Sequence, residues 1–348
     1  MSDPVSASAI PDRTTPLVAV RDLSVSFVSR DETVRAVNGV SFDVMPGEAL
    51  CIIGESGSGK TVTMRSLMRL LPKHRSVIEG GISVAGNDIQ ALDERRLSQL
   101  RGSLMAMIFQ EPMTALDPVY TIGEQIAEVV RRHTHATRPA AMARALELLQ
   151  LVKVPSPERR LKAYPHELSG GMRQRAMIAI ALACQPALLL ADEPTTALDA
   201  TVQIQVLILL RKLQKEFGMA LIFVTHDLSV AAQIADRVAV MYAGRMVEQG
   251  SVREVLLNPR HPYTIGMLSS TLHGRVRGQD IETIPGSPPD LRALPPGCSF
   301  APRCSRAIES CSAAVPAPIV LSPGHDVRCI RTQDQPAPFS PASTLAVS

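Results

Sequence analysis

One stretch decides the fold: Gly54-Glu55-Ser56-Gly57-Ser58-Gly59-Lys60-Thr61. It has the form G-x-x-x-x-G-K-[ST], with the apolar run 49–53 before it and a helical pattern after it. Glycines let the backbone turn tightly so that its N–H groups point at phosphate oxygens, and the start of the following helix adds its dipole. The pattern predicts a phosphate-binding loop between a strand and a helix. Lys60 is expected to contact the β- and γ-phosphates of a nucleotide, and the Thr61 hydroxyl to bind Mg²⁺.

An acidic pair follows a second apolar run further along the chain. Residues 188–190 are all leucine, as expected for a strand covered on both faces, and Asp192 and Glu193 come directly after that strand. Ligands of doubly wound sheets bind at the carboxyl ends of the strands. We therefore expect Asp192 to bind Mg²⁺ and Glu193 to orient or deprotonate the attacking water. Alone, such a pair is usually a solvated turn, but beside a phosphate loop it indicates a functional site.

Apolar runs and helical patterns alternate along the chain, which predicts an α/β fold with a largely parallel central sheet. The expected strands are Leu17–Val28, Glu48–Ile53, Gly81–Ala85, Leu104–Phe109, Ala187–Asp192, Ala220–Thr225 and Val238–Tyr242. The expected helices are Lys60–Leu71, Ile122–His133, Pro139–Leu151, Met172–Cys184 and Val202–Phe217.

The patterns also predict how the chain is divided. A nucleotide-binding domain is expected over residues 17–258, with an inserted helical subdomain at about 112–171 that has no convincing strand. After about Pro259 the content of Pro, Gly and Cys rises, and residues 259–330 are expected to form a short extension. Residues 1–16 and 331–348 are polar or Pro-rich and are expected to be flexible tails.

The composition excludes several classes of protein. The chain has 348 residues, 45% hydrophobic and 20% charged, with a net charge of +3 and only 3% aromatic residues. These values indicate a globular protein and argue against a nucleic-acid partner. No run reaches the ~18–20 apolar residues of a membrane helix, and the N-terminal segment lacks the apolar core of a secretory signal. We therefore expect a cytosolic protein, whose cysteines would be thiols or metal ligands.

A second anion-binding pattern separates this chain from other nucleotide-binding proteins. Leu168-Ser169-Gly170-Gly171-Met172 opens an expected helix, where free N–H groups and a hydroxyl can hold an anion. One triphosphate does not need two such loops from one chain. The simplest explanation is that this loop binds the γ-phosphate of a nucleotide held by a partner chain.

These motifs, in this order, resemble those of the ATP-binding subunits of ATP-binding-cassette (ABC) transporters, over roughly residues 17–250. Residues 168–172 match the family's signature motif, Gln110 its Q-loop glutamine, residues 197–199 its D-loop and His226 its switch histidine. The resemblance implies that Gln110 contacts Mg²⁺ or water and that His226 holds the γ-phosphate and Glu193 in register. It also implies that Asp199 helps to join the two halves of a dimer.

Adenine recognition is less sharply indicated. The family often stacks the base on an aromatic side chain upstream of the phosphate loop, and Phe27 is the best match in position. Phe27 is equally well explained as a core residue of an edge strand.

The region after Pro259 indicates which branch of this family the chain resembles. His261-Pro262-Tyr263-Thr264, Ile284-Pro285-Gly286 and residues 295–298 resemble the C-terminal extension of oligopeptide and dipeptide importer ATPases. The same region holds four cysteines with the spacing C-x5-C-x6-C-x17-C, namely Cys298, Cys304, Cys311 and Cys329. Four thiolates in a segment with little core suit an iron–sulfur cluster or structural Zn²⁺, and the resemblance favours [4Fe–4S]. The alternative is four reduced structural thiols; Cys51 and Cys184 are expected in the core.

The resemblance implies an ATPase that powers import of di- or oligopeptides, on the cytoplasmic face of the cell (inner) membrane. Its partners would be a second ATPase subunit, identical or different, two membrane permeases and an extracytoplasmic substrate-binding protein. Importers of nickel chelates and glutathione are closely related alternatives. A soluble ABC ATPase of translation or repair is disfavoured, because only one cassette is present and it has no long insertion. A non-catalytic regulatory binder is disfavoured because Glu193 and His226 are both present.

Overall fold

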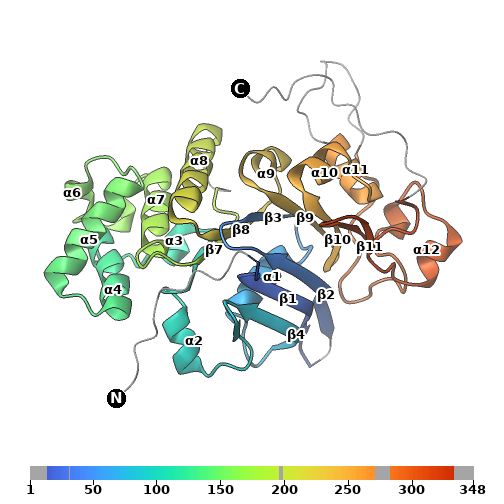
Figure 1. The fold of residues 1–348 in the computed structure, drawn as a ribbon, viewed down its shortest axis with the longest axis horizontal. Helices are drawn as coiled ribbons and strands as arrows, with labels where there is room; N and C mark the ends of the chain where they lie inside the picture. The colour runs from blue at the N-terminus through green and yellow to red at the C-terminus, as the bar shows by residue number, and fades with distance from the viewer. Residues whose placement is uncertain (1–13, 31, 196–198, 271–282, 333–348) are drawn as a thin grey trace.

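The computed structural model describes residues 14–30, 32–195, 199–270 and 283–332. Two β-sheets lie near the middle of the molecule, with a group of helices at one end and the C-terminal segment at the other (Figure 1). The predicted tails lie outside the described residues, apart from positions 14–16, 331 and 332. Within the described ranges, no helix is both long enough and apolar enough to cross a bilayer.

The larger sheet carries the predicted parallel strands. Its strand order is β11 (Ile319–Ser322), β12 (His325–Val327), β10 (Arg245–Ser251), β9 (Arg237–Tyr242), β3 (Ala49–Ile53), β8 (Ala220–Thr225), β7 (Leu188–Asp192) and β6 (Met105–Ile108). Strands β6, β7, β8, β3 and β9 pair in parallel, whereas β9, β10, β12 and β11 pair antiparallel. The prediction of a parallel centre is confirmed, and an antiparallel edge extends it.

Side chains of the central strands alternate between two cores. In β3, Cys51 and Ile53 face a core shared with helices, whereas Leu50 and Ile52 face a second core. Every residue of β3, β7 and β8 is buried. Strands covered on both faces need apolar residues at every position, which explains the unbroken apolar runs in the sequence.

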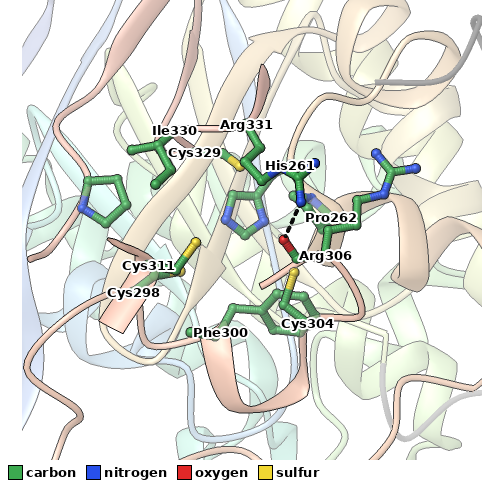
Figure 2. Close-up of a pocket in the computed structure, with 12 residues that line it drawn as sticks. His261, Pro262, Cys298, Phe300, Cys304, Arg306, Cys311, Cys329, Ile330 and Arg331 are labelled. Atoms are coloured by element: carbon green, nitrogen blue, oxygen red, sulfur yellow. Dashed lines mark hydrogen bonds between the residues drawn. The ribbon is translucent and has the colours of Figure 1, made fainter. Parts of the chain in front are cut away.

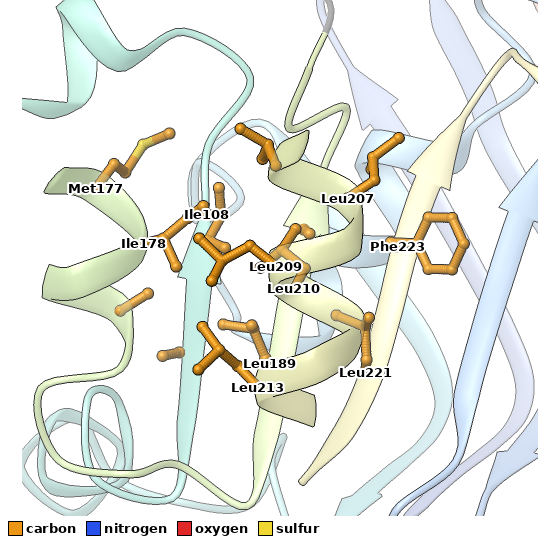
Figure 3. Close-up of a cluster of buried hydrophobic side chains, with 14 of the residues drawn as sticks. Ile108, Met177, Ile178, Leu189, Leu207, Leu209, Leu210, Leu213, Leu221 and Phe223 are labelled. Atoms are coloured by element: carbon orange, nitrogen blue, oxygen red, sulfur yellow. The ribbon is translucent and has the colours of Figure 1, made fainter. Parts of the chain in front are cut away.

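The first core lies between the sheet and the long helices α7 (Gly170–Ala181) and α8 (Ala200–Phe217). Figure 3 shows Leu189 and Leu221 of the sheet packed with Ile178 of α7 and Leu210 of α8. Burying each leucine stabilises the fold by roughly 1.5–3 kcal/mol. This packing holds the carboxyl ends of the strands, where the acidic pair lies, in a fixed place.

The second core lies between the larger sheet, helix α1 (Lys60–Leu67) and a separate antiparallel sheet. The strand order of this second sheet is β2 (Thr33–Val44), β1 (Val18–Val28), β4 (Ser76–Val84) and β5 (Asn87–Asp88). Strand β2 is not among the predicted strands, because Asn38-Gly39 in its middle is typical of a turn. In the structure Gly39 has a φ of +65° inside the strand, and its N–H donates to Ser24 Oγ at 3.0 Å. The pairing with β1 shifts register here, as at a β-bulge.

Between β6 and β7 the described chain contains helices and no strand. These elements are α3 (Pro112–Ala115), α4 (Ile122–Thr134), α5 (Arg138–Leu151), α6 (Pro157–Arg160), the 3₁₀ turn η1 (Pro165–Glu167) and α7. Thr121, Thr137 and Ser169 each cap a helix by accepting a hydrogen bond from a backbone N–H of the first turn.

Several other elements differ from the prediction. The short helices α2 (Glu94–Leu100) and α9 (Leu228–Ile234) and the strand β10 were not expected. They are short or rich in polar residues, so their periodicity is weak. Helix α1 ends at Leu67 and not at Leu71, because Arg69 adopts a left-handed φ of +49°.

The C-terminal segment extends the larger sheet and packs beside it. It contains α10 (Val252–Leu257), α11 (Pro262–Ser269), η2 (Ala301–Arg303), α12 (Glu309–Ala313) and the edge strands β12 and β11. The buried Glu248 of β10 anchors it: the N–H groups of Arg260 and His261 donate to its carboxylate at 2.7 and 2.9 Å. Nε2 of the buried His325 lies 3.0 Å from the same carboxylate. Polar contacts thus hold a segment whose sequence has little apolar periodicity.

Candidate functional site

The loop of residues 54–61 connects β3 to α1, as predicted. Gly54 and Gly59 have φ values of +156° and +101°. A Cβ at Gly54 would come within 2.1 Å of the Met241 carbonyl oxygen, and one at Gly59 within 2.4 Å of the Ala36 carbonyl oxygen. No side chain fits at either position. The glycines allow the loop to pack directly against neighbouring backbone.

Lys60 lies inside the loop. It is 5% exposed, and its Nζ donates to the carbonyl oxygens of Gly54 and Glu55, each at 2.8 Å. Burial lowers the pKa of Lys60, and the nearby carboxylates of Glu193 and Asp192 act in the opposite direction. The ammonium group is therefore held by backbone carbonyls within the loop, where the motif predicts a phosphate contact.

Asp192 lies opposite Thr61 at the end of β7. The Thr61 hydroxyl donates to Asp192 Oδ1 at 2.8 Å, and Asp192 is 1% exposed. Burial raises the pKa of Asp192, with the hydrogen bond from Thr61 acting against the rise. Asp192 Oδ2 and Ser58 Oγ are buried without a hydrogen-bond partner among the described residues. A hydroxyl and a carboxylate with a spare oxygen fit a hard divalent cation such as Mg²⁺.

Glu193 follows Asp192 and is approached by two of the predicted residues. Gln110 Nε2 donates to Glu193 Oε2 at 3.1 Å, and His226 Nδ1 lies 3.8 Å from the same oxygen. Glu193 has a φ of +44°, a strained conformation for a residue with a side chain. Its side chain is 17% exposed, whereas that of His226 is 64% exposed.

The topology explains why these residues meet. Gln110 follows β6, Asp192 ends β7, His226 follows β8 and Gly54 follows β3. These four strands are parallel neighbours, so their carboxyl ends share one edge of the sheet. The structure therefore brings together the phosphate loop, the acidic pair, Gln110 and His226.

The signature residues do not join this group. Ser169, Gly170 and Gly171 line an open groove together with Asp199 and Arg175. Ser169 Oγ accepts a hydrogen bond from Met172 N at the start of α7, and Asp199 Oδ1 accepts one from Val202 N at the start of α8. Residues 197 and 198, matched to the D-loop, lie outside the described residues.

Phe27 lies near the end of β1 and is partly buried against the second core. Strand β1 lies between β2 and β4, so it is an inner strand and not the edge strand that the core explanation assumed. The described contacts leave both interpretations of Phe27 open.

The four C-terminal cysteines line one cavity, together with His261, Phe300 and Arg306 (Figure 2). Burial raises the pKa of the Cys298, Cys304 and Cys329 thiols. Within the described residues, no three His, Cys, Asp or Glu side chains are arranged to hold a metal ion. The arrangement therefore does not support the predicted iron–sulfur cluster or zinc site. Of the other cysteines, Cys51 is buried in β3 and Cys184 is partly buried.

Two residues at the phosphate loop were not predicted. Arg303 and Tyr263, both from the C-terminal segment, contact Glu55. Tyr263 belongs to the His-Pro-Tyr-Thr stretch, which pointed to a family but not to a role. Arg303 precedes Cys304, and nothing in its sequence surroundings indicates a partner almost 250 positions away.

A phosphate loop, a buried acid beside its threonine and a glutamate at the same sheet edge define the chain as a nucleotide-binding cassette. A family model described as "ABC transporter" matches residues 37–196, and one described as "Oligopeptide/dipeptide transporter, C-terminal region" matches residues 247–311. The chain belongs to the ABC transporter family of ATP-binding proteins, in its oligopeptide and dipeptide branch. It is an ATPase of the kind that couples ATP hydrolysis to transport.

Relatives match along nearly the whole chain. A peptide import ATP-binding protein of Brucella melitensis is 51% identical and covers 92% of this chain and 98% of its own length. The oligopeptide transport ATP-binding protein OppD of Salmonella typhimurium is 46% identical over 96% of this chain and 99% of its own. The dimeric ATP-binding cassette MJ0796, bound to ADP and Pi, matches with a TM-score of 0.61 and 29% identity, over 68% of this chain and 99% of that one. The predicted resemblance is confirmed.

Proposed function

We propose that this chain powers an importer of di- or oligopeptides. The observation that carries the proposal is the match to relatives named as peptide, dipeptide and oligopeptide transport ATP-binding proteins over more than nine-tenths of the chain. The match of residues 247–311 to a transporter-specific C-terminal region supports it. The described contacts favour neither nickel chelates nor glutathione as cargo.

We propose that the loop at residues 54–61 holds the phosphates of ATP. Its backbone N–H groups and the start of α1 would bind phosphate oxygens, and Lys60 would exchange its carbonyl partners for the β- and γ-phosphates. Thr61 and Asp192 would hold Mg²⁺, with Gln110 as a further ligand. When bound, the ion neutralises charge that develops on the phosphates.

Glu193 is proposed as the residue that orients or deprotonates the attacking water. Gln110 and His226 both lie next to its carboxylate, so they can fix its direction. A glutamate accepts a proton from water only when it is ionised and aimed at that water. His226 would also donate a hydrogen bond to the γ-phosphate, where charge accumulates during hydrolysis.

The signature residues and Asp199 are proposed to act on the nucleotide of a second cassette. Support comes from their separate position, in a groove open to solvent and away from the phosphate loop. Each ATP would then lie between the phosphate loop of one cassette and Ser169–Gly171 of the other. We further propose two membrane permeases and an extracytoplasmic substrate-binding protein as partners, and a peripheral position on the cytoplasmic face of the inner membrane.

Uptake by proteoliposomes tests the proposed cargo. The chain is co-purified with its permeases and partner ATPase, reconstituted and supplied with the binding protein and labelled di- or pentapeptides. ATP-dependent uptake of peptides is the expected result, and it should be lost when Glu193 is replaced by Gln. Uptake of a nickel chelate or glutathione, with none of peptides, would contradict the proposal.

The four cysteines line one cavity, so a metal-bound form and four reduced thiols are the two cases for experiment to distinguish. Because burial raises the pKa of the Cys298, Cys304 and Cys329 thiols, metal binding would have to displace their protons. Anaerobic purification followed by absorbance and metal analysis distinguishes the cases. Iron with inorganic sulfide would establish [4Fe–4S], and zinc alone the alternative. Intact protein with neither would establish four reduced structural thiols.

A further inference from the structure

Glu55, the second residue of the phosphate loop, forms an ion pair with the C-terminal segment. Arg303 Nη1 donates to Glu55 Oε2 at 2.9 Å and to Oε1 at 3.2 Å. The side chain of Arg303 is 7% exposed and that of Glu55 is 29% exposed. An ion pair shielded from water in this way is screened much less than a surface pair.

The backbone of Glu55 is held by the same segment. Glu55 N donates to the hydroxyl oxygen of Tyr263 at 2.9 Å. Tyr263 is fully buried in α11, and its ring packs against Tyr242, with 4.6 Å between ring centroids, and against Phe300 at 5.5 Å. The acceptor for this N–H therefore sits on a side chain that packing fixes in place.

Arg303 is itself fixed by several contacts. Its Nε donates to the Pro285 carbonyl oxygen at 2.8 Å, and its Nη1 donates to the Tyr242 hydroxyl at 3.2 Å. Its guanidinium carbon lies 5.8 Å from the centre of the Tyr242 ring. Arg303 ends the short turn η2, and the next residue, Cys304, lines the cysteine cavity. One turn thus carries both the arginine and a wall of that cavity.

These contacts reach Lys60. The carbonyl oxygen of Glu55 accepts a hydrogen bond from Lys60 Nζ, at 2.8 Å. Glu55 is therefore held through its N–H by Tyr263, through its carboxylate by Arg303 and through its carbonyl by Lys60. A displacement of Glu55 would move a carbonyl that holds the Lys60 ammonium group in place before a phosphate replaces it.

We propose that Arg303 and Tyr263 are positioning residues that hold the phosphate loop, through Glu55, in the shape that binds ATP. The C-terminal segment, which carries the four cysteines, would then help to stabilise the nucleotide site. This inference rests on the proposed role of residues 54–61 as the ATP site. It assigns to the C-terminal segment a part in ATP binding that is separate from any contact with cargo or permease.

A double-mutant cycle tests the inference. The variants are Arg303→Ala, Glu55→Gln and both together, in the full-length chain, with MgADP as the probe because it is not hydrolysed. We expect Arg303→Ala to raise the Kd for MgADP about tenfold, since it leaves a partly buried carboxylate without its partner. The ATPase KM should rise by a similar factor, with kcat changed less than about threefold. The Kd of the double variant for MgADP should be no higher than the Kd of whichever single variant binds MgADP more weakly.

Two further variants separate positioning from folding. Tyr263→Phe removes only the acceptor for Glu55 N and keeps the buried ring, and it should raise the Kd about three- to tenfold. Arg292→Ala is the matched control, because Arg292 lies in the same segment and forms an ion pair with Glu32, but its side chain is 57% exposed. This control should bind MgADP like the parent chain. Thermal melts of all variants without nucleotide show which are folded.

Each outcome decides the inference. Folded Arg303→Ala and Tyr263→Phe variants with the parent Kd would overturn it, as would effects of Arg303→Ala and Glu55→Gln that simply add. A lower melting temperature with an unchanged Kd would assign these residues a structural role only. Lys60→Ala, measured alongside, tests the ATP site itself: unchanged MgADP binding in that variant would contradict the proposed function independently.

Discussion

Two regions of the molecule are proposed to bind phosphate, and they differ in the groups that they contain. At the carboxyl edge of the parallel strands, the hydroxyl of Thr61 donates to Asp192, and Lys60 and Glu193 are the chain neighbours of these two residues. At the start of α7, Ser169 and its glycines line an open groove that contains neither a lysine nor an acid from that group. Under the proposed function, the first region has the groups that would bind and cleave a triphosphate, whereas the second has only groups that would complete such a site.

The difference has a physical cause. Parallel strands bring together residues that are far apart in the sequence, because their carboxyl ends share an edge. A helix start supplies N–H groups and a capping hydroxyl, but no neighbouring strand end brings it a base or a metal ligand. Under the proposed function, the site of a nucleotide held at the first region would therefore be completed by the signature groove of another cassette.

The largest expected effect comes from Glu193→Gln. Because the amide cannot accept a proton from water, kcat should fall by roughly 1,000-fold or more, while the Kd for MgATP stays within about twofold of the parent value. Single-turnover hydrolysis and equilibrium binding measure the two quantities. Undiminished hydrolysis would show that the first region lacks the general base assigned to it.

A smaller effect is expected in the second region, from Ser169→Ala. Loss of a hydroxyl proposed to contact the γ-phosphate of the partner's ATP should lower kcat by roughly 100-fold and leave MgADP binding unchanged. Thr137→Ala is the matched control, because Thr137 caps α5 in the same way and lies on another helix. Both variants should lose about 1 kcal/mol of stability. Equal kcat values for the two would remove the distinction between the regions.

Phe27→Ala tests whether the first region extends to the adenine base. If Phe27 stacks on the base, the Kd for MgATP should rise about tenfold, and Phe27→Tyr should restore it. The affinity for inorganic triphosphate should not change, because that probe has no base. A loss of stability with unchanged Kd would show that Phe27 is only a core residue.

The smallest effect concerns the stability of the first region without nucleotide. Burial raises the pKa of Asp192, so the folded protein holds this proton more tightly than the unfolded chain does. The stability gained in this way is fully present below the ordinary pKa of an aspartate. It is lost as the pH rises through the raised pKa of the folded state. Asp192→Asn removes the buried charge and keeps an acceptor for Thr61. At pH 7 the variant should therefore be more stable than the parent, and this gain should shrink toward pH 4. Denaturant unfolding at both pH values measures it; an equal gain at both would contradict the assigned cause.

Much of this site could be predicted from the sequence because its signals are local. The glycines of the phosphate loop, the apolar run before Asp192 and the serine that caps α7 each follow from backbone sterics or hydrogen bonding within a few residues. Strand β2 escaped prediction because Asn38-Gly39 resembles a turn until the pairing with β1 places Gly39 in a bulge. The metal centre expected from four cysteines is not supported, because spacing along the chain does not determine how thiols converge in space.

The sequence by itself determined the fold class, the phosphate loop and the order of the residues around it. Each depends on periodicity or on a contiguous motif. Only the tertiary structure decided which of these residues meet, and that the signature groove stands apart from the phosphate loop. It also revealed the hydrogen bonds that Glu55 forms with Arg303 and Tyr263, which lie more than 200 residues further along the chain. Such a contact depends on how the C-terminal segment packs against the sheet, and this packing cannot be predicted from the local sequence.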